Sequence, residues 1–178
     1  MKEWDAEMRK KDYSSEELID FFKNKPMDFA PGEKFLYNNS AYFLLGYIIE
    51  KASGKTYEAY LKDTFFEPLG MNNSSYGNTS RIIKNRAAGY MKKDGEFINA
   101  FFLSMTQPYA TGSLLSTVDD LFKWYTAFMN DNVISKTNRE KAHSSYFLNN
   151  GKPTGYGFGW FLGNIQGSPI IEHGGGIN

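Results

Sequence analysis

The chain has 178 residues, of which 41% are hydrophobic and 17% aromatic, and this composition excludes a disordered chain. Twenty Lys and Arg residues balance twenty Asp and Glu residues. The basic footprint of a nucleic-acid-binding protein is therefore missing, and no nucleic-acid partner is expected. With no cysteine and two histidines, disulfides and thiolate metal sites are excluded, and neither a metal nor another cofactor is expected.

Two features argue against a membrane segment. The longest apolar run, residues 41–49, is much shorter than the ~20 residues that a membrane helix needs. Residues 1–18 are charged and lack the apolar core of a signal peptide. We therefore expect no membrane span and no signal peptide in the sequence as given.

Helices are predicted in the first part of the chain. Ser14 followed by Glu17 is typical of a capping box at the start of a short helix. A longer helix is predicted to begin near Ser40 and to end before Gly54. This prediction rests on an apolar stripe at helical spacing, formed by Ala41, Leu44, Leu45, Ile48, Ile49 and Ala52.

The later part of the chain mixes helices with hairpins. We predict a helix over residues 57–66, a hairpin turn at Asp94-Gly95 and two antiparallel strands around Gly167. Thr117, three residues before Asp120, marks the start of another helix. One face of that helix carries Val118, Leu121, Phe122, Tyr125 and Phe128.

The segment Tyr37-Asn38-Asn39 is the first candidate for chemistry, because it precedes a predicted helix. The positive end of a helix dipole favours negative charge, so a phenol placed there can take and return a proton. A nearby amide can hold a substrate carbonyl. The alternative is purely structural: Asn39 or Ser40 caps the helix, and Tyr37 packs as a half-buried aromatic residue.

The segment EHGGG, residues 172–176, is the second candidate. A histidine at a strand end followed by three glycines leaves backbone N–H groups open to a ligand, which is how an oxyanion or carboxylate site is built. The alternative is a flexible glycine-rich turn with a surface His173. The other histidine, His143, lies in a polar stretch and is expected to be solvated.

Taken in order, these segments resemble the serine β-lactamase and penicillin-binding-protein-like family, in its class C β-lactamase, esterase and D-aminopeptidase branch. The resemblance covers residues 14–178. It rests on three stretches, PGEKFLYNNSAYFLLGYIIEKASGKTYEAYLKDTFFEPLGM, then ATGSLLSTVDDLFKW, then YGFGW followed by EHGGG. No single tripeptide is specific, and the ordered set carries the resemblance.

The resemblance implies an α+β fold of the β-lactamase/transpeptidase type. Residues 1–178 would form one incomplete domain, with a mainly helical lobe over residues 14–150 and a few antiparallel strands of an incomplete sheet over residues 151–178. The implied activity is that of a serine hydrolase acting on a small acyl, peptide or β-lactam-like substrate. The family mostly works outside the cytoplasm, so a periplasmic or extracytoplasmic location is expected.

The resemblance also implies roles for individual residues. In the family's Tyr-x-Asn motif the tyrosine transfers protons and the asparagine binds the catalytic lysine and substrate, and these positions match Tyr37 and Asn39. The third motif is Lys-Thr-Gly in true class C β-lactamases and often His-x-Gly in esterase-like members. It matches His173 as a catalytic residue and the three glycines Gly174, Gly175 and Gly176 as substrate-binding residues.

One family motif is missing from the sequence. The nucleophile of the family comes from Ser-x-x-Lys, and no serine here has a lysine three residues later. An isolated serine is a weak nucleophile without an adjacent base. We therefore interpret the chain as an internal fragment of a longer hydrolase that is inactive by itself and that self-associates through its incomplete sheet. The alternative is a non-catalytic binding or interaction module that retains the fold.

Overall fold

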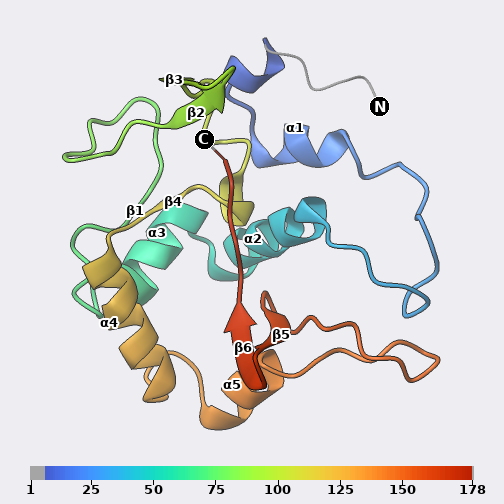
Figure 1. Cartoon of the computed structure of the whole chain (residues 1–178). Helices are drawn as coiled ribbons and strands as arrows, with labels where there is room; N and C mark the ends of the chain where they lie inside the picture. The colour runs from blue at the N-terminus through green and yellow to red at the C-terminus, as the bar shows by residue number, and fades with distance from the viewer. Residues whose placement is uncertain (1–6, 178) are drawn as a thin grey trace.

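The computed structural model describes residues 7–177, and helix α2 (Asn39–Ser53) lies near the centre of the molecule (Figure 1). Gly54 ends the helix in the left-handed conformation, with φ of 69°, as the sequence predicted. The cap was wrongly predicted at Asn39 or Ser40. Asn38 has an extended backbone, and its side chain accepts a 3.3 Å hydrogen bond from the Ala41 N–H, so it caps the helix one residue earlier.

The main core is built where short helices meet α2. They are α1 (Ser15–Asp20), α3 (Tyr57–Leu61), the π turn η2 (Lys62–Phe66) and the 3₁₀ turn η3 (Tyr109–Thr111). The capping box at the start of α1 is confirmed, and so is the helix over residues 57–66. The buried core residues are Leu18, Phe43, Tyr57, Leu61, Phe66, Met71 and Tyr109.

A glycine on α2 lets η3 approach the helix closely. A Cβ atom at Gly46 would lie 2.7 Å from Cε1 of Tyr109 and would also collide with the Ala110 side chain. Real Cβ atoms do not tolerate such contacts, so only glycine fits here without movement of η3. This contact fixes the position of the chain segment that leads into the following strand.

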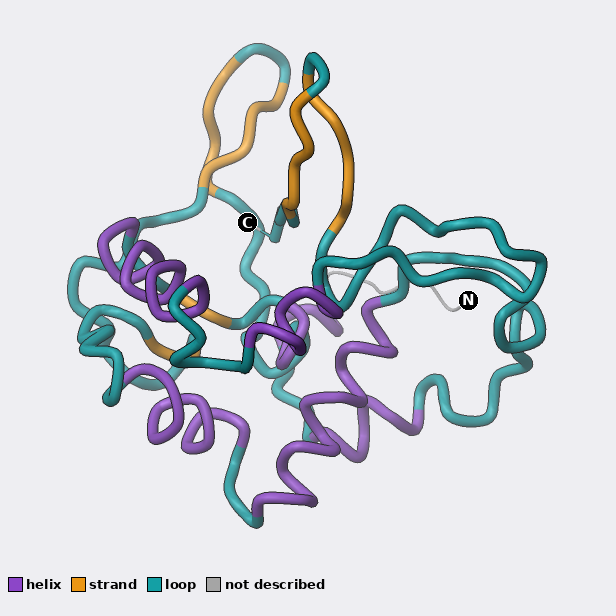
Figure 2. The backbone as a smooth tube through the Cα atoms, turned by 90° about the horizontal axis from the view of Figure 1, so that it is seen from below, coloured by secondary structure: helices purple, strands orange, loops and turns teal. Residues whose placement is uncertain are grey.

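The strands form three separate two-stranded antiparallel sheets. The pairs are β1 (Ser75–Tyr76) with β4 (Leu114–Leu115), β2 (Tyr90–Lys93) with β3 (Glu96–Asn99), and β5 (Phe161–Ile165) with β6 (Ser168–Glu172). Figure 2 shows the two longer hairpins extending from the same side of the helical part. Together with the helices they make the mixed α+β architecture that the sequence predicted.

Both predicted hairpin turns are confirmed. Asp94 and Gly95 have φ angles of 50° and 90°, and Gln166 and Gly167 have φ angles of 51° and 88°. Two successive positive φ angles are the signature of the type I′ turn, whose twist matches that of the strands it joins.

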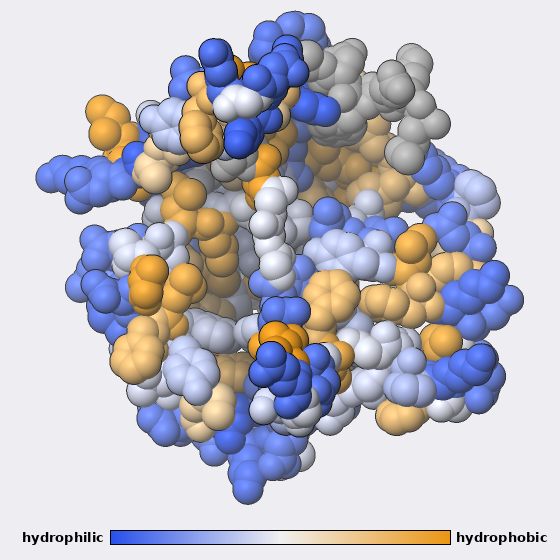
Figure 3. All heavy atoms as spheres, viewed as in Figure 1, coloured by the Kyte–Doolittle hydropathy of each residue, from blue (hydrophilic) through white to orange (hydrophobic). Residues whose placement is uncertain are grey.

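Helix α4 (Val118–Met129) follows β4, and α5 (Lys136–Ala142) follows α4. The side chains predicted to share one face of α4 are mostly exposed, among them Val118 at 82% and Phe122 at 66%. Figure 3 shows hydrophobic residues at the surface over this helix. Of the predicted face only Phe128 is buried, and the helix also buries Asp120 and Ala127. Among residues 7–177, no helix combines the length and hydropathy needed to cross a membrane.

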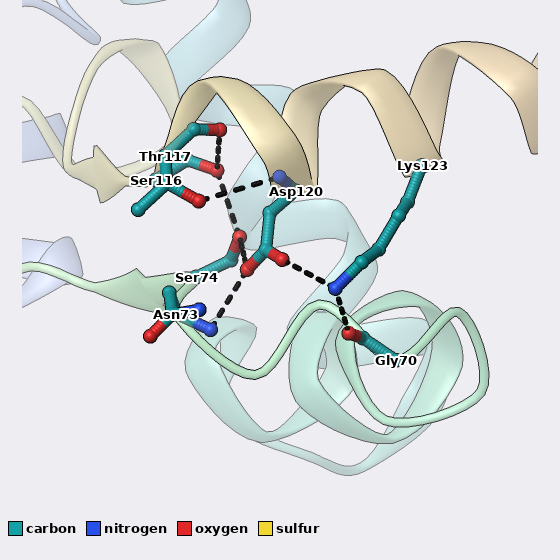
Figure 4. Close-up of polar contacts among 7 residues, drawn as sticks. All are labelled: Gly70, Asn73, Ser74, Ser116, Thr117, Asp120 and Lys123. Atoms are coloured by element: carbon teal, nitrogen blue, oxygen red, sulfur yellow. Dashed lines mark hydrogen bonds and ion pairs between the residues drawn. The ribbon is translucent and has the colours of Figure 1, made fainter.

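A fully buried carboxylate ties α4 to the loop between η2 and β1 (Figure 4). Asp120 Oδ2 accepts hydrogen bonds from the Asn73 N–H at 2.7 Å and from the Ser74 hydroxyl at 3.0 Å. Its Oδ1 lies 2.8 Å from Lys123 Nζ, which also donates to the Gly70 carbonyl at 2.6 Å. The carboxylate is thus paired and hydrogen-bonded, as buried charge requires.

The same contacts set the protonation of this group. Burial raises the pKa of the Asp120 carboxyl, but hydrogen bonds from Lys123, the Asn73 N–H and Ser74 outweigh burial and hold that pKa below its ordinary value. A lowered pKa in the folded state stabilises the fold at pH values above the ordinary aspartate pKa. This contribution is lost as the pH falls below about 4.

We predict that Asp120→Asn lowers the free energy of unfolding by about 3 kcal/mol, because it removes one partner of a buried, hydrogen-bonded ion pair. Urea unfolding at pH 7 measures the change. Asp119→Asn is the matched control, since Asp119 is exposed in the same helical turn and should change stability by at most about 1 kcal/mol. Equal losses in both variants would contradict the assignment, as would an Asp120 variant that keeps the acid sensitivity of the unaltered chain.

Candidate active site

Tyr37 lies in the loop just before Asn38, the cap of α2, and the residue is 39% exposed. Its ring centroid lies 5.6 Å from that of His173 and 6.0 Å from those of Phe161 and Tyr156. The start of α2 and the end of β6 therefore meet, although they come from distant parts of the sequence (Figure 1). The two segments singled out by their residue types share one place in the fold.

Tyr156 packs against the other rings of this cluster. It is buried, and its ring lies 4.7 Å from that of Phe161 and 6.1 Å from that of His173. Burial raises the pKa of the Tyr156 phenol well above its ordinary value, so this phenol stays neutral. Its hydroxyl makes no hydrogen bond of good geometry among the described residues, although the Tyr42 hydroxyl lies near enough to add to the raised pKa. Tyr37, which is partly exposed, is the phenol of this cluster that lines the cleft.

The imidazole of His173 has a defined tautomer when neutral. Its Nδ1 lies 2.7 Å from the Gly174 carbonyl oxygen. A carbonyl oxygen can only accept, so Nδ1 carries the proton and Nε2 keeps a lone pair. An Nε2 lone pair can accept a proton or a hydrogen bond from a substrate or a nucleophile.

The glycines after His173 are open to ligands. A Cβ atom added at Gly174, Gly175 or Gly176 would meet no atom within 4 Å. Packing therefore does not require glycine at these positions. The absence of side chains leaves the backbone accessible, which is the condition for an N–H group to bind an oxyanion or a carboxylate.

These groups line one open cleft of about 1170 Å³. Every residue predicted for the site lies along it: Tyr37, Asn39, His173, Gly174, Gly175 and Gly176. Figure 3 shows the surface hollowed beside the C-terminal segment. The structure thus brings the predicted residues together, and their catalytic and binding roles stay predictions.

Sequence reasoning missed the other residues that line the cleft. They include residues 86–89 and 100–103, at the base of the hairpin formed by β2 and β3, together with Gln107, Thr111, Gly112, Leu114 and Leu115. No motif marks Arg86 or Phe101 as cleft residues. The only available signal was the hairpin itself, and its position over the cleft depends on tertiary packing.

The expectation that His143 is a solvated surface residue was wrong. Its ring packs 5.4 Å from that of Phe128 and 5.6 Å from that of Trp160, and the residue is half-buried. Burial lowers the pKa of His143, with the nearby Arg139 adding to the effect. His143 lies outside the cleft. Among residues 7–177, no group of three or more His, Cys, Asp and Glu side chains could hold a metal ion.

Comparison with known proteins gives a consistent family. The family model described as Beta-lactamase matches residues 2–178. Penicillin-binding protein 4* of Bacillus subtilis is 33% identical over 178 residues, covering 91% of this chain and 39% of that protein. The human mitochondrial serine beta-lactamase-like protein LACTB is 36% identical over 123 residues, covering 68% and 22%. The chain spans well under half the length of these two relatives.

Solved structures agree with the fold. The octameric penicillin-binding protein homologue from Pyrococcus abyssi is 36% identical, with a TM-score of 0.73 over 90% of this chain and 38% of that chain. A D-stereospecific amidohydrolase from Streptomyces superposes with a TM-score of 0.81 over 96% of this chain and 52% of that chain. At 23% identity, the second likeness is a likeness of fold.

The unpartnered hydroxyl of Tyr156 gives a testable prediction. A buried hydroxyl without a hydrogen bond costs folding free energy, so Tyr156→Phe is expected to raise the free energy of unfolding by about 1 kcal/mol. The matched control is Tyr76→Phe, because the Tyr76 hydroxyl donates to the Met105 carbonyl at 3.0 Å. The control should lose about 1 kcal/mol.

Urea unfolding of both variants measures the pair. A loss of stability in Tyr156→Phe equal to that in Tyr76→Phe would show that the Tyr156 hydroxyl has a bonding partner after all.

Proposed function

The chain belongs to the Beta-lactamase family, whose members are serine hydrolases of the β-lactamase and penicillin-binding-protein type, and on this premise we propose that it forms the proton-transfer and oxyanion side of such an enzyme's cleft. Tyr37 would transfer the proton, and Asn39 would hold the substrate. His173 would assist through Nε2, and the Gly176 N–H would bind the oxyanion. The proximity of the Tyr37 and His173 rings, at 5.6 Å, carries this proposal.

We propose that the nucleophile lies in a Ser-x-x-Lys segment outside this sequence. The composition of the cleft supports this, because neither a serine nor a lysine is among the described residues that line it. Thr111 is the one aliphatic hydroxyl along this lining, and it already donates to the Pro108 carbonyl at 2.5 Å. By itself the chain would then be inactive.

The substrate class follows from the chemistry of the third motif. His173 stands where true class C β-lactamases have a lysine, so this position lacks a permanent cation. The family acts on acyl or peptide substrates, and we propose a peptidase or esterase activity on small acyl compounds rather than efficient hydrolysis of β-lactams.

A second candidate function is a non-catalytic binding module. The same cleft, without a serine or lysine in its described lining, would bind an acyl or peptide ligand without cleaving it. The two candidates differ in one respect. The hydrolase requires a second segment that brings a nucleophile to the cleft, whereas the binding module does not.

We predict that a fluorophosphonate or penicillin probe adds no mass to this chain, since a serine without an adjacent base is a weak nucleophile. Intact-mass spectrometry measures the result. A longer form of the protein that includes a Ser-x-x-Lys segment should be labelled, and Tyr37→Phe in that form should slow labelling by about 10²–10⁴-fold.

Tyr47→Phe is the control for this experiment, because the Tyr47 hydroxyl bonds to Glu16 and lies outside the cleft. A stoichiometric adduct on a serine of the short chain would refute the placement of the nucleophile. Unchanged labelling in the Tyr37 variant of the longer form would refute the role of the phenol.

We also propose that the chain self-associates through β5 and β6. Apart from a bridge between Phe161 and Tyr156 at the start of β5, the two strands pair only with each other among the described residues. Most of each outer edge is therefore unpaired, and Ile165 and Ile171 are 58% and 44% exposed. The relative from Pyrococcus abyssi is described as octameric.

Sedimentation velocity is expected to show an average mass that rises with protein concentration. Ile171→Lys should shift the chain toward the monomer, because a charge on an edge strand opposes pairing between chains. Ile82→Lys is the control, since Ile82 is 93% exposed and lies outside both strands. A monomer at every concentration would contradict the proposal.

A further inference from the structure

The hairpin formed by β2 and β3 has one face that the rest of the described chain leaves exposed. Paired residues of neighbouring strands point to the same side of a sheet, and alternate residues of one strand do so too. The register therefore gathers four side chains on this face, which we call the outer face: Tyr90, Lys92, Phe97 and Asn99. Met91 and Ile98 point to the other face, where both are half-buried.

The outer face is open to a broad partner. β2 and β3 form a separate two-stranded sheet, and Figure 2 shows the two longer hairpins extending from the helical part. The aromatic residues Tyr90 and Phe97 are 63% and 78% exposed. Large apolar side chains that are exposed together on one face are typical of a surface that binds another molecule.

The charge of this region is positive, although the chain as a whole is neutral. Residues 77–99 contain five Lys and Arg but only two Asp and Glu. Arg81 is paired with an acidic side chain of α3. In contrast, no ion pair among the described residues involves Lys84, Lys92 or Lys93. The region therefore complements a negatively charged surface.

The two acidic residues of the hairpin do not belong to the outer face. Asp94 lies in the turn, and Glu96 is paired in register with Lys93, one position away from the residues of the outer face. The outer face thus combines two aromatic rings, one amide and one lysine with no acidic side chain.

We propose that the outer face of the hairpin binds the surface of an anionic lipid bilayer. Aromatic rings are favoured at the level of the lipid headgroups, and lysines near the surface are attracted by anionic lipids. The stem of Lys92 can lie along the apolar region while its ammonium group stays among the headgroups. The chain would lie on the bilayer rather than span it. Because the base of the same hairpin lines the cleft, such binding holds the cleft close to the lipid surface.

The test is flotation of the chain with vesicles of phosphatidylcholine mixed with phosphatidylglycerol, and with vesicles of phosphatidylcholine alone. Flotation separates chains bound to lipid from chains that only associate with one another. Binding to the anionic vesicles is expected to be about tenfold tighter at ~0.1 M salt. This preference should disappear at ~1 M salt, where the Debye length falls to about 3 Å.

Two substitutions test the outer face. Phe97→Ser and Lys92→Gln should each weaken binding to the anionic vesicles by about fivefold, because one removes a ring from the headgroup region and the other a cation. The matched controls are Phe122→Ser on α4 and Lys152→Gln, which also replace exposed side chains but lie outside the hairpin. Both controls should bind like the unaltered chain.

The remaining outcomes would overturn the proposal. They are equal binding to both kinds of vesicle, no binding to either, and a loss in Phe122→Ser as large as that in Phe97→Ser, which would assign the contact to α4. If Phe97→Ser lowers the average mass in sedimentation velocity and leaves flotation unchanged, the outer face joins copies of the chain and the proposal fails.

Discussion

The packing of aromatic rings around Tyr156 is the interaction on which the candidate site depends. The buried ring contacts Tyr37 before α2 and His173 after β6, so it joins two segments that no strand pairing connects. Edge-to-face geometry, as between Tyr156 and Phe161 at 4.7 Å and 74°, adds about 1 kcal/mol to the burial of such rings. Because each ring has a fixed shape, this packing also sets the separation of the phenol and the imidazole.

Two further contacts keep the remainder of the cleft in place. Gly46 lets η3 lie directly against α2, and this contact positions the chain that leads to Leu114 and Leu115 along the cleft. The buried carboxylate of Asp120 then fixes the start of α4 against the loop before β1. The cleft is therefore built on the helical core, whereas its two ligand-facing edges are a hairpin base and a glycine segment, which make fewer packing contacts.

Local signals were sufficient for the secondary structure. Capping residues, an apolar stripe and paired turn residues act within a few positions, so the sequence predicted α1, α2 and the hairpin at Asp94-Gly95. Errors arose where tertiary contacts decide. His143 became half-buried because Phe128 and Trp160 reach it from two other segments. The cap at Asn38 is a local error, because it rests on the extended backbone of Asn38 and on its hydrogen bond from the Ala41 N–H. Burial of a helix face is likewise decided by its neighbours, which explains the exposed stripe of α4.

The candidate site likewise combines residues that the sequence predicted with residues that only tertiary packing reveals. The ordered motifs predicted that Tyr37 and His173 share a cleft, because a family resemblance carries long-range information that residue spacing does not. Nothing local marks Arg86 or Phe101 as cleft residues, because their place beside the cleft depends on tertiary packing. Proton transfer needs groups that can give and take a proton, and a phenol and an imidazole are groups of this kind. Their rings lie 5.6 Å apart and both pack against Phe161 and Tyr156, so the proposed chemistry depends on contacts that no local motif encodes.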